Sequence, residues 1–120
     1  TIEIPGLPSL QGFRARGGHW SKGTKHDRAW QAHVRWRLQL AGLPEHPLER
    51  AFLTLTRRSS RAPDYDNLVA SFKPLVDSLR PHEGFRGVIV DDSMDHITSD
   101  YRWTHTTDKL GGVTIEVEER

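Results

Sequence analysis

The chain contains no cysteine and no long hydrophobic run, and these two absences exclude several classes of protein. Without cysteine there is no disulfide framework, no zinc–thiolate site and no cysteine nucleophile. The longest apolar runs, such as residues 87–90, fall far short of the roughly 20 residues that a membrane-spanning helix needs. The first residues lack the basic-then-apolar pattern of a signal peptide, so we expect a cytoplasmic protein without a membrane partner.

The size and composition are those of one globular domain. With 120 residues, of which 35% are hydrophobic and 28% charged, the chain is expected to form a single domain over residues 1–120. A chain of this length buries roughly two-thirds of the surface that its unfolded form exposes, which provides a hydrophobic core without covalent staples.

Positive charge is concentrated in the first half of the chain, although the net charge is only +1. Residues 1–61 contain 11 Lys or Arg against 4 Asp or Glu, whereas residues 62–120 contain 6 against 12. Arginine outnumbers lysine 13 to 4, and its planar guanidinium suits bidentate phosphate recognition. The basic half indicates a polyanionic partner, with a merely solvated basic surface as the equally weighted alternative. Its densest part comprises Arg14, Arg16, Lys22, Lys25, Arg28, Arg35 and Arg37.

Hydrophobic periodicity and turn residues predict an α+β fold, a mixed β-sheet with two main helices in β-α-β-α-β-β-β order. Strands are expected over residues 1–4, 51–58, 87–90, 97–105 and 113–118, and helices over residues 24–41 and 66–80. The first helix is expected to stop at Gly42, and residues 110–112 predict a hairpin between the last two strands. Ile97, Tyr101 and Trp103 alternate on one face, which suits the core and a protein partner equally.

The second helix has one charged side and one apolar side. At about 100° per residue, Lys73, Asp77 and Arg80 fall within about 40° of Asp66, and the apolar residues lie on the far side. These apolar residues are Leu68, Phe72, Leu75, Val76 and Leu79. Pro74 removes one backbone hydrogen bond and should bend the helix.

Two pairs of aspartates flank this helix in the sequence. Asp64 and Asp66 are two residues apart in an extended stretch, so their side chains point to the same side. Asp91 and Asp92 follow the 87–90 run, and we expect a turn to bring them to the Asp64 end of the helix. An oxygen-only set of this kind favours a hard cation such as Mg²⁺, and a lysine beside it suits phosphodiester hydrolysis.

Each of these motifs has an ordinary structural explanation when taken alone. Asp-x-Asp is common in turns and helix caps, and the Asp-Asp-Ser at residues 91–93 is typical of a turn after a strand. Lys73 is equally compatible with a solvated helix face, and Asp77 with Arg80 suits a surface helix pair. The hypothesis of a metal site therefore depends on the motifs occurring together.

Three segments of the chain carry a family resemblance. They are Asp64-Tyr65-Asp66-Asn67-Leu68, Lys73-Pro74-Leu75-Val76-Asp77-Ser78-Leu79 and Gly87-Val88-Ile89-Val90-Asp91-Asp92-Ser93. In this order they resemble the RusA family of Holliday-junction resolvases, the crossover junction endodeoxyribonucleases of bacteria and their phages. The resemblance implies a RusA-like fold and a homodimeric, Mg²⁺-dependent endonuclease that resolves four-way DNA junctions by paired symmetric nicks in the bacterial or phage-infected cell.

The resemblance also implies roles for individual residues. Asp64, Asp66, Asp92 and Lys73 are implied as catalytic residues, and Asp64, Asp66, Asp91 and Asp92 as ligands of Mg²⁺ or of Mn²⁺ in its place. Lys73 departs from the family pattern, because it lies seven residues after Asp66 where the best-known form has four. The residues expected to bind DNA are Arg14, Arg16, Lys22, Lys25, Arg28, Arg57, Arg58 and Arg61.

Two other functions remain open from the sequence. A nuclease for other branched DNA, such as forks and flaps, would use the same chemistry on a broader substrate. A non-catalytic DNA-binding protein that assists recombination would use the carboxylates for structure or for metal binding alone.

Overall fold

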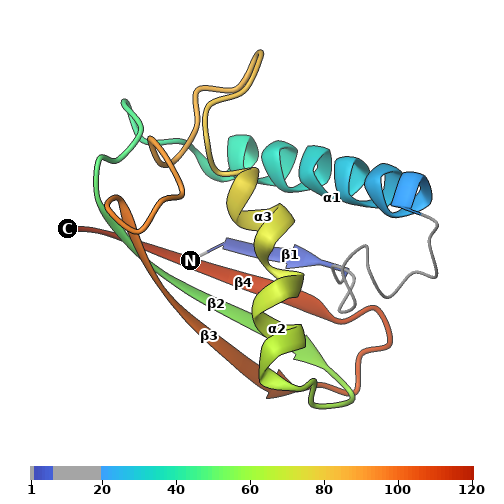
Figure 1. Ribbon diagram of the computed structural model, residues 1–120. Coiled ribbons are helices and arrows are strands. Elements are labelled where there is room, and N and C mark those ends of the chain that lie inside the picture. The colour runs from blue at the N-terminus through green and yellow to red at the C-terminus, as the bar shows by residue number, and fades with distance from the viewer. Residues whose placement is uncertain (1, 7–19) are drawn as a thin grey trace.

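The computed structural model describes residues 2–6 and 20–120, and it describes side chains over residues 2–6 and 27–120 (Figure 1). The elements are β1 (Ile2–Pro5), α1 (Trp20–Ala41), β2 (Ala51–Ser59), α2 (Tyr65–Ser71), α3 (Lys73–Asp77), β3 (Ile97–His105) and β4 (Gly112–Glu119). The predicted α+β class is confirmed, with one mixed sheet and helices. No helix in the described part of the chain has both the length and the apolar character that crossing a membrane requires.

The sheet has the strand order β1-β4-β2-β3. β2 pairs in parallel with β3 and antiparallel with β4, so that Leu55 lies opposite Tyr101 on one side and Ile115 on the other. β3 and β4 are therefore not neighbours, and the predicted hairpin is wrong. Residues 106–111 instead carry the chain across the end of β2, where the amide of Thr106 donates to the carbonyl of Ser59 (3.1 Å). This connection is longer than the two to five residues of a tight hairpin.

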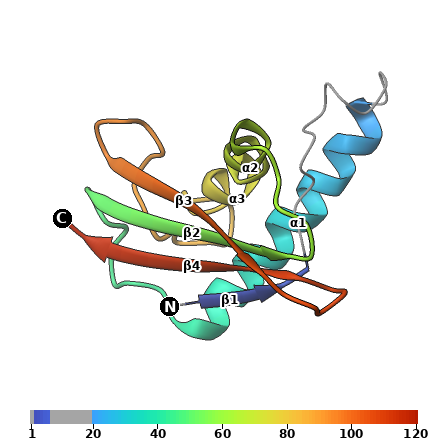
Figure 2. The same cartoon turned by 90° about the horizontal axis from the view of Figure 1, so that it is seen from below.

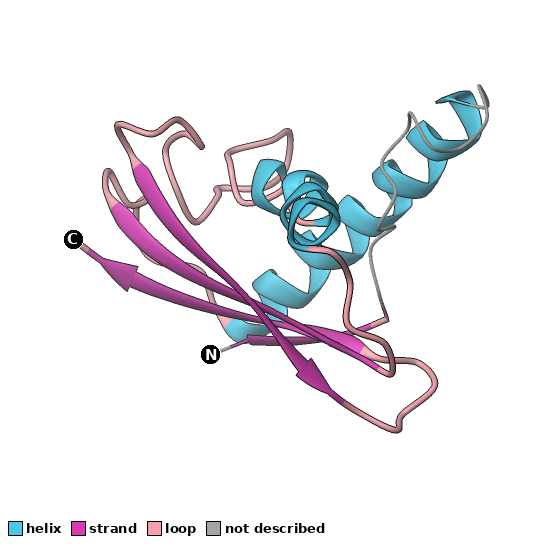
Figure 3. Cartoon of the chain, turned by 60° about the horizontal axis from the view of Figure 1, so that its bottom comes forward, coloured by secondary structure: helices cyan, strands magenta, loops and turns pink. Residues whose placement is uncertain are grey.

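The core lies between one face of the sheet and the helices (Figure 2, Figure 3). Side chains of β2 alternate strictly in burial, and Ala51, Leu53 and Leu55 face the helices. The predicted apolar face of α1 is also buried through Trp30, Val34 and Leu38.

Helix α1 ends where it was predicted to end, but it begins earlier. Gly42 has a φ of +99°, a left-handed conformation that favours glycine, and its amide donates to the carbonyl of Leu38 (3.1 Å). The helix begins at Trp20, four residues before the predicted start at Thr24.

The predicted helix over residues 66–80 is interrupted near Pro74, as its sequence indicates. α2 and α3 meet at Phe72, which retains helical angles (φ −87°, ψ −7°). Proline lacks an amide hydrogen and its ring crowds the carbonyl one turn earlier, so the hydrogen-bond ladder breaks there. The carbonyl of Pro74 accepts a hydrogen bond from Nε2 of Gln31 (3.0 Å), which ties α3 to α1. The predicted apolar side, Leu68, Phe72, Leu75, Val76 and Leu79, is buried.

The apolar run over residues 87–90 is not a strand, so the predicted β-α-β-α-β-β-β order is wrong at this point. Val88 and Ile89 are buried. The β pairing of this run in the described structure is one isolated parallel bridge, between Ile89 and Leu48. Its backbone groups bond to segments outside the four-stranded sheet. The amide of Val88 donates to the carbonyl of Leu79 (2.7 Å), and the carbonyl of Val88 accepts from the amide of Leu48 (2.8 Å). The observed order is β-α-β-α-α-β-β.

Candidate functional site

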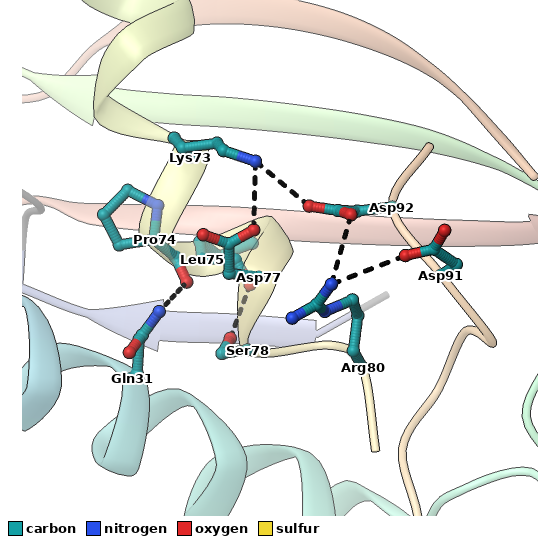
Figure 4. Close-up of polar contacts among 9 residues, drawn as sticks. All are labelled: Gln31, Lys73, Pro74, Leu75, Asp77, Ser78, Arg80, Asp91 and Asp92. Carbon is teal, nitrogen blue, oxygen red and sulfur yellow. Dashed lines mark hydrogen bonds and ion pairs between the residues drawn. The ribbon is translucent and has the colours of Figure 1, made fainter. Parts of the chain in front are cut away.

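Five charged residues from α3, from the turn that follows it and from the loop after residue 90 meet beside the sheet (Figure 4). Nζ of Lys73 lies 3.1 Å from Oδ1 of Asp77 and 3.1 Å from Oδ2 of Asp92. Nη1 of Arg80 lies 3.4 Å from Oδ1 of Asp91 and 3.6 Å from Oδ1 of Asp92. We call these five residues the charged cluster.

Backbone contacts position the two sides of the charged cluster. Lys73 begins α3 and Asp77 ends it, one helical turn apart. On the other side, the amide of Val90 donates to the carbonyl of Leu48 (3.0 Å), directly before Asp91 and Asp92. Because residues 88–90 bond both to Leu48 and to Leu79, two residues after α3, the two aspartates lie alongside that helix.

The three central groups of the charged cluster shift one another's pKa values. A hydrogen bond from the Asp77 carboxyl, together with one from Lys73, lowers the pKa of Asp92 to about 2. Burial raises the pKa of Asp77, and its hydrogen bond with Asp92 raises it further. The hydrogen bond to Asp92 likewise raises the pKa of Lys73. Asp92 is thus the ionised carboxylate of the pair, and Asp77 is the carboxyl that takes up a proton more readily.

A cavity of about 480 Å³ adjoins the charged cluster. Its wall is mostly apolar and comes from α2, α3 and β3, and Lys73, Asp92 and Asp27 of α1 contribute charged groups to it. The apolar contributors include Val69, Val76, Ile97 and Tyr101. A site of this size, with apolar walls and a few polar groups, has the composition of a small-ligand or substrate pocket.

Asp64 and Asp66 do not join the charged cluster. Both are exposed at the start of α2, where Asp64 is the N-cap residue and makes no side-chain capping bond. The prediction that Asp91 and Asp92 return to this end of the helix is wrong. The reason is the contact of residues 88–90 with Leu48 and Leu79, which directs the following aspartates toward Lys73 and Arg80 instead.

The described residues therefore do not fit the metal site that the sequence predicts. Within residues 2–6 and 20–120 as described, no group of three or more His, Asp or Glu side chains is placed to hold a metal ion. One oxygen of Asp92 faces Lys73 and the other faces Arg80, so cationic side chains already neutralise this carboxylate.

The predicted DNA-binding residues differ in their access to solvent. Arg57 is only 4% exposed, because it continues the inward-facing row of β2, and burial lowers its pKa. Its assignment as a surface DNA contact is wrong. Arg28 and Arg61 are exposed, and Arg58 is half-buried, with its Nη1 3.7 Å from Oε1 of Glu3. Of the others, Arg14 and Arg16 lie outside the described residues, as do the side chains of Lys22 and Lys25.

Sequence reasoning assigned no functional role to four residues of this region. Asp77 and Arg80 were placed on the same helical face as Lys73 but interpreted as a surface pair, whereas both belong to the charged cluster. Asp27 and Tyr101 line the cavity, but nothing local in the sequence marks them, because they reach it from α1 and β3. No family model, characterised protein or solved structure matches the chain.

Proposed function

We propose that the chain is a RusA-type, structure-specific endodeoxyribonuclease that resolves four-way DNA junctions by paired symmetric nicks. The observation that carries the proposal is the meeting of Lys73, Asp77 and Asp92 within hydrogen-bond distance. These residues come from the second and third of the segments that resemble the family. They are separated in sequence, so their convergence is a property of the fold rather than of one local motif.

Lys73 is the group best suited to contact a scissile phosphate. Its side chain is 69% exposed although Nζ bonds two carboxylates, so an anion has access to it. The raised pKa keeps the ammonium protonated at neutral pH. A fixed positive charge beside a phosphoryl group stabilises the charge that develops during displacement at phosphorus.

The two aspartates have different parts in this proposal. Asp92, with a side chain only 14% exposed, stays ionised and positions Lys73 and Arg80. Asp77 has the raised pKa and is therefore the better candidate to exchange a proton with the reacting groups. Tuning two neighbouring carboxyls in opposite directions is a common way to separate such roles.

Mg²⁺, with Mn²⁺ as its alternative, enters the proposal through the family resemblance and through the preference of hard cations for carboxylates. The described carboxylates form no three-ligand group, so the roles of Lys73, Asp77 and Asp92 above do not depend on the ion. The dependence on a divalent cation is instead one of the quantities to be measured.

Branched DNA is the proposed partner, in a homodimer whose two sites act on two strands of a roughly symmetric junction. Exposed Arg28 and Arg61, with the basic first half of the chain, support the binding of a polyanion. The bacterial or phage-infected cytoplasm is the location that this substrate implies.

The test is cleavage of a labelled synthetic four-way junction by the purified protein, with Mg²⁺, with Mn²⁺ and with a chelator. A fork and a linear duplex of the same sequence serve as substrate controls. The expected result is paired nicks at symmetric positions in the junction, abolished by the chelator. Equal cleavage of the fork would replace the proposal with a broader branched-DNA nuclease. Tight junction binding without nicks under every ion would favour the accessory protein.

A further inference from the structure

β3 is the longer of the two edge strands of the sheet (Figure 1). It has 9 residues, against 4 in β1, and β2 is its only partner among the described strands. Its sequence, ITSDYRWTH, contains no proline and no lysine, the residues that commonly block an open edge. A long edge of this kind offers a row of backbone donors and acceptors to a further strand.

The side chains of β3 are complementary to a second, antiparallel copy of the same strand. In an antiparallel pair, residues that face each other must both direct their backbone groups across the gap or both direct them away. Because backbone groups alternate in direction along a strand, facing residues of two identical strands differ by an even number of positions. The two-fold axis between two copies therefore passes through a residue that faces its own equivalent. If that residue is Tyr101, Asp100 of each copy lies opposite Arg102 of the other.

No other nearby centre joins these opposite charges. A centre at Asp100 places that carboxylate opposite the same carboxylate of the other copy, which is destabilising. A centre at Arg102 does the same with two guanidinium groups. A centre at Ser99 places Asp100 opposite the partner's Thr98, and a centre at Trp103 places Arg102 opposite the partner's Thr104. Asp100 and Arg102 already form an ion pair within the strand (2.8 Å), so both charges are on the same sheet face.

We propose that β3 is a dimerisation edge, on which a second copy of this chain pairs antiparallel with the two-fold axis at Tyr101. The two four-stranded sheets then form one continuous sheet. On the outer face, Asp100 and Arg102 form a ladder of alternating charge with their equivalents. On the inner face, half-buried Trp103 lies opposite the partner's Ser99, and Tyr101 lies opposite the partner's Tyr101.

This interface adjoins the candidate site. Ile97 and Tyr101 of β3 line the cavity that also contains Lys73 and Asp92. Pairing at Tyr101 therefore adds the aromatic ring of the partner's Tyr101 next to each cavity. It also places the two charged clusters on the same side of the continuous sheet. The interface depends on β3 and not on whether the chain is a nuclease.

Cysteine cross-linking tests the register, because the chain has no cysteine of its own. Thr98 and Thr104 are exposed and face each other across the proposed two-fold axis. The double variant Thr98→Cys/Thr104→Cys should form a disulfide-linked dimer under mild oxidation, whereas each single variant should not, because a bridge requires Cα atoms within about 7 Å. Tyr101→Cys should cross-link alone. Cross-linking of the single variants to the same extent as the double variant would overturn the register.

Charge reversal tests the interface in solution by sedimentation velocity. Asp100→Arg and Arg102→Asp should each weaken dimerisation about tenfold or more, since each places like charges opposite one another. The double variant Asp100→Arg/Arg102→Asp should restore it. Circular dichroism of each variant separates loss of pairing from loss of folding. A wild-type protein that is monomeric at every concentration, or a dimer indifferent to both single reversals, would overturn the proposal.

Discussion

Nζ of Lys73 lies 3.1 Å from Oδ2 of Asp92, which is 19 residues further along the chain. The same nitrogen bonds Asp77 one turn further along α3, so one ammonium joins a helix to a loop. This contact is at once part of the fold and the centre of the candidate site. A substitution at Lys73, Asp77 or Asp92 is therefore expected to change both stability and activity, and both should be measured for each variant.

Lys73→Met should lower the rate of junction cleavage about 100-fold or more while the protein still binds the junction. The reason is the loss of an ammonium that is both fixed by two carboxylates and open to solvent. Lys109→Met, at an exposed lysine outside the charged cluster, is the matched control and should cleave as the wild type does. A Lys73→Met protein that is folded and cleaves at the wild-type rate would remove Lys73 from the site.

Asp92→Asn should lower the free energy of unfolding by about 1 to 3 kcal/mol at neutral pH, because Lys73 and Arg80 lose their shared counter-ion. Asp77→Asn should change it by less than about 1 kcal/mol, because the amide can donate to Asp92 as the protonated carboxyl does. Urea unfolding of both variants measures the difference. Equal losses would show that Asp77 does not act as the donor of the pair.

The stability should depend on pH through Asp92. Its folded pKa of about 2 lies below the ordinary 3.8, so its contribution is fully present above pH 3.8 and is lost as the pH falls through about 2. Asp77 acts in the opposite sense, because its raised pKa favours folding when it is protonated and disfavours it as the pH rises. Unfolding series from pH 2 to pH 6 should show a shallower acid limb in Asp92→Asn than in the wild type.

Gly87→Ala should destabilise the fold by about 2 kcal/mol or more, and Gly84→Ala by about 1 kcal/mol. Both glycines have a positive φ, +94° and +74° respectively. Only at Gly87 would a Cβ also meet backbone, at 2.8 Å from the nitrogen of Pro81, whereas nothing lies within 4 Å at Gly84. Thermal unfolding of the two variants separates crowding of the Cβ from backbone strain. Equal losses of stability in the two variants would exclude crowding as a cause.

Arg61→Ala should weaken junction binding and reduce the salt dependence of the binding constant by about one phosphate contact. Arg57→Met should leave that salt dependence unchanged and lower stability instead, because Arg57 is buried on the inner face of β2. Binding titrations at several salt concentrations distinguish the two arginines. A flattened salt dependence in a folded Arg57→Met protein would return this residue to the DNA-contacting surface.

Local patterns in the sequence were sufficient for the elements whose causes are local. The spacing of Trp30, Val34 and Leu38 predicted the buried face of α1, and Pro74 predicted the interruption between α2 and α3. The alternation of β2 places Arg57, two residues after Leu55, on the same face as Leu55. Charge suggested exposure for this arginine, but the pleat of the strand placed it inside.

Contacts between distant segments were decided only by the tertiary structure. The place of β4 between β1 and β2 depends on pairing with two strands far away in sequence, which no periodicity records. In the same way, Asp92 meets Lys73 rather than Asp66 because Val88 bonds to Leu79 and Leu48. The sequence by itself determined which residues carry charge and on which face of each element they lie. The folded loops decided which of those charges meet, because backbone hydrogen bonds far from the site set the path of the chain.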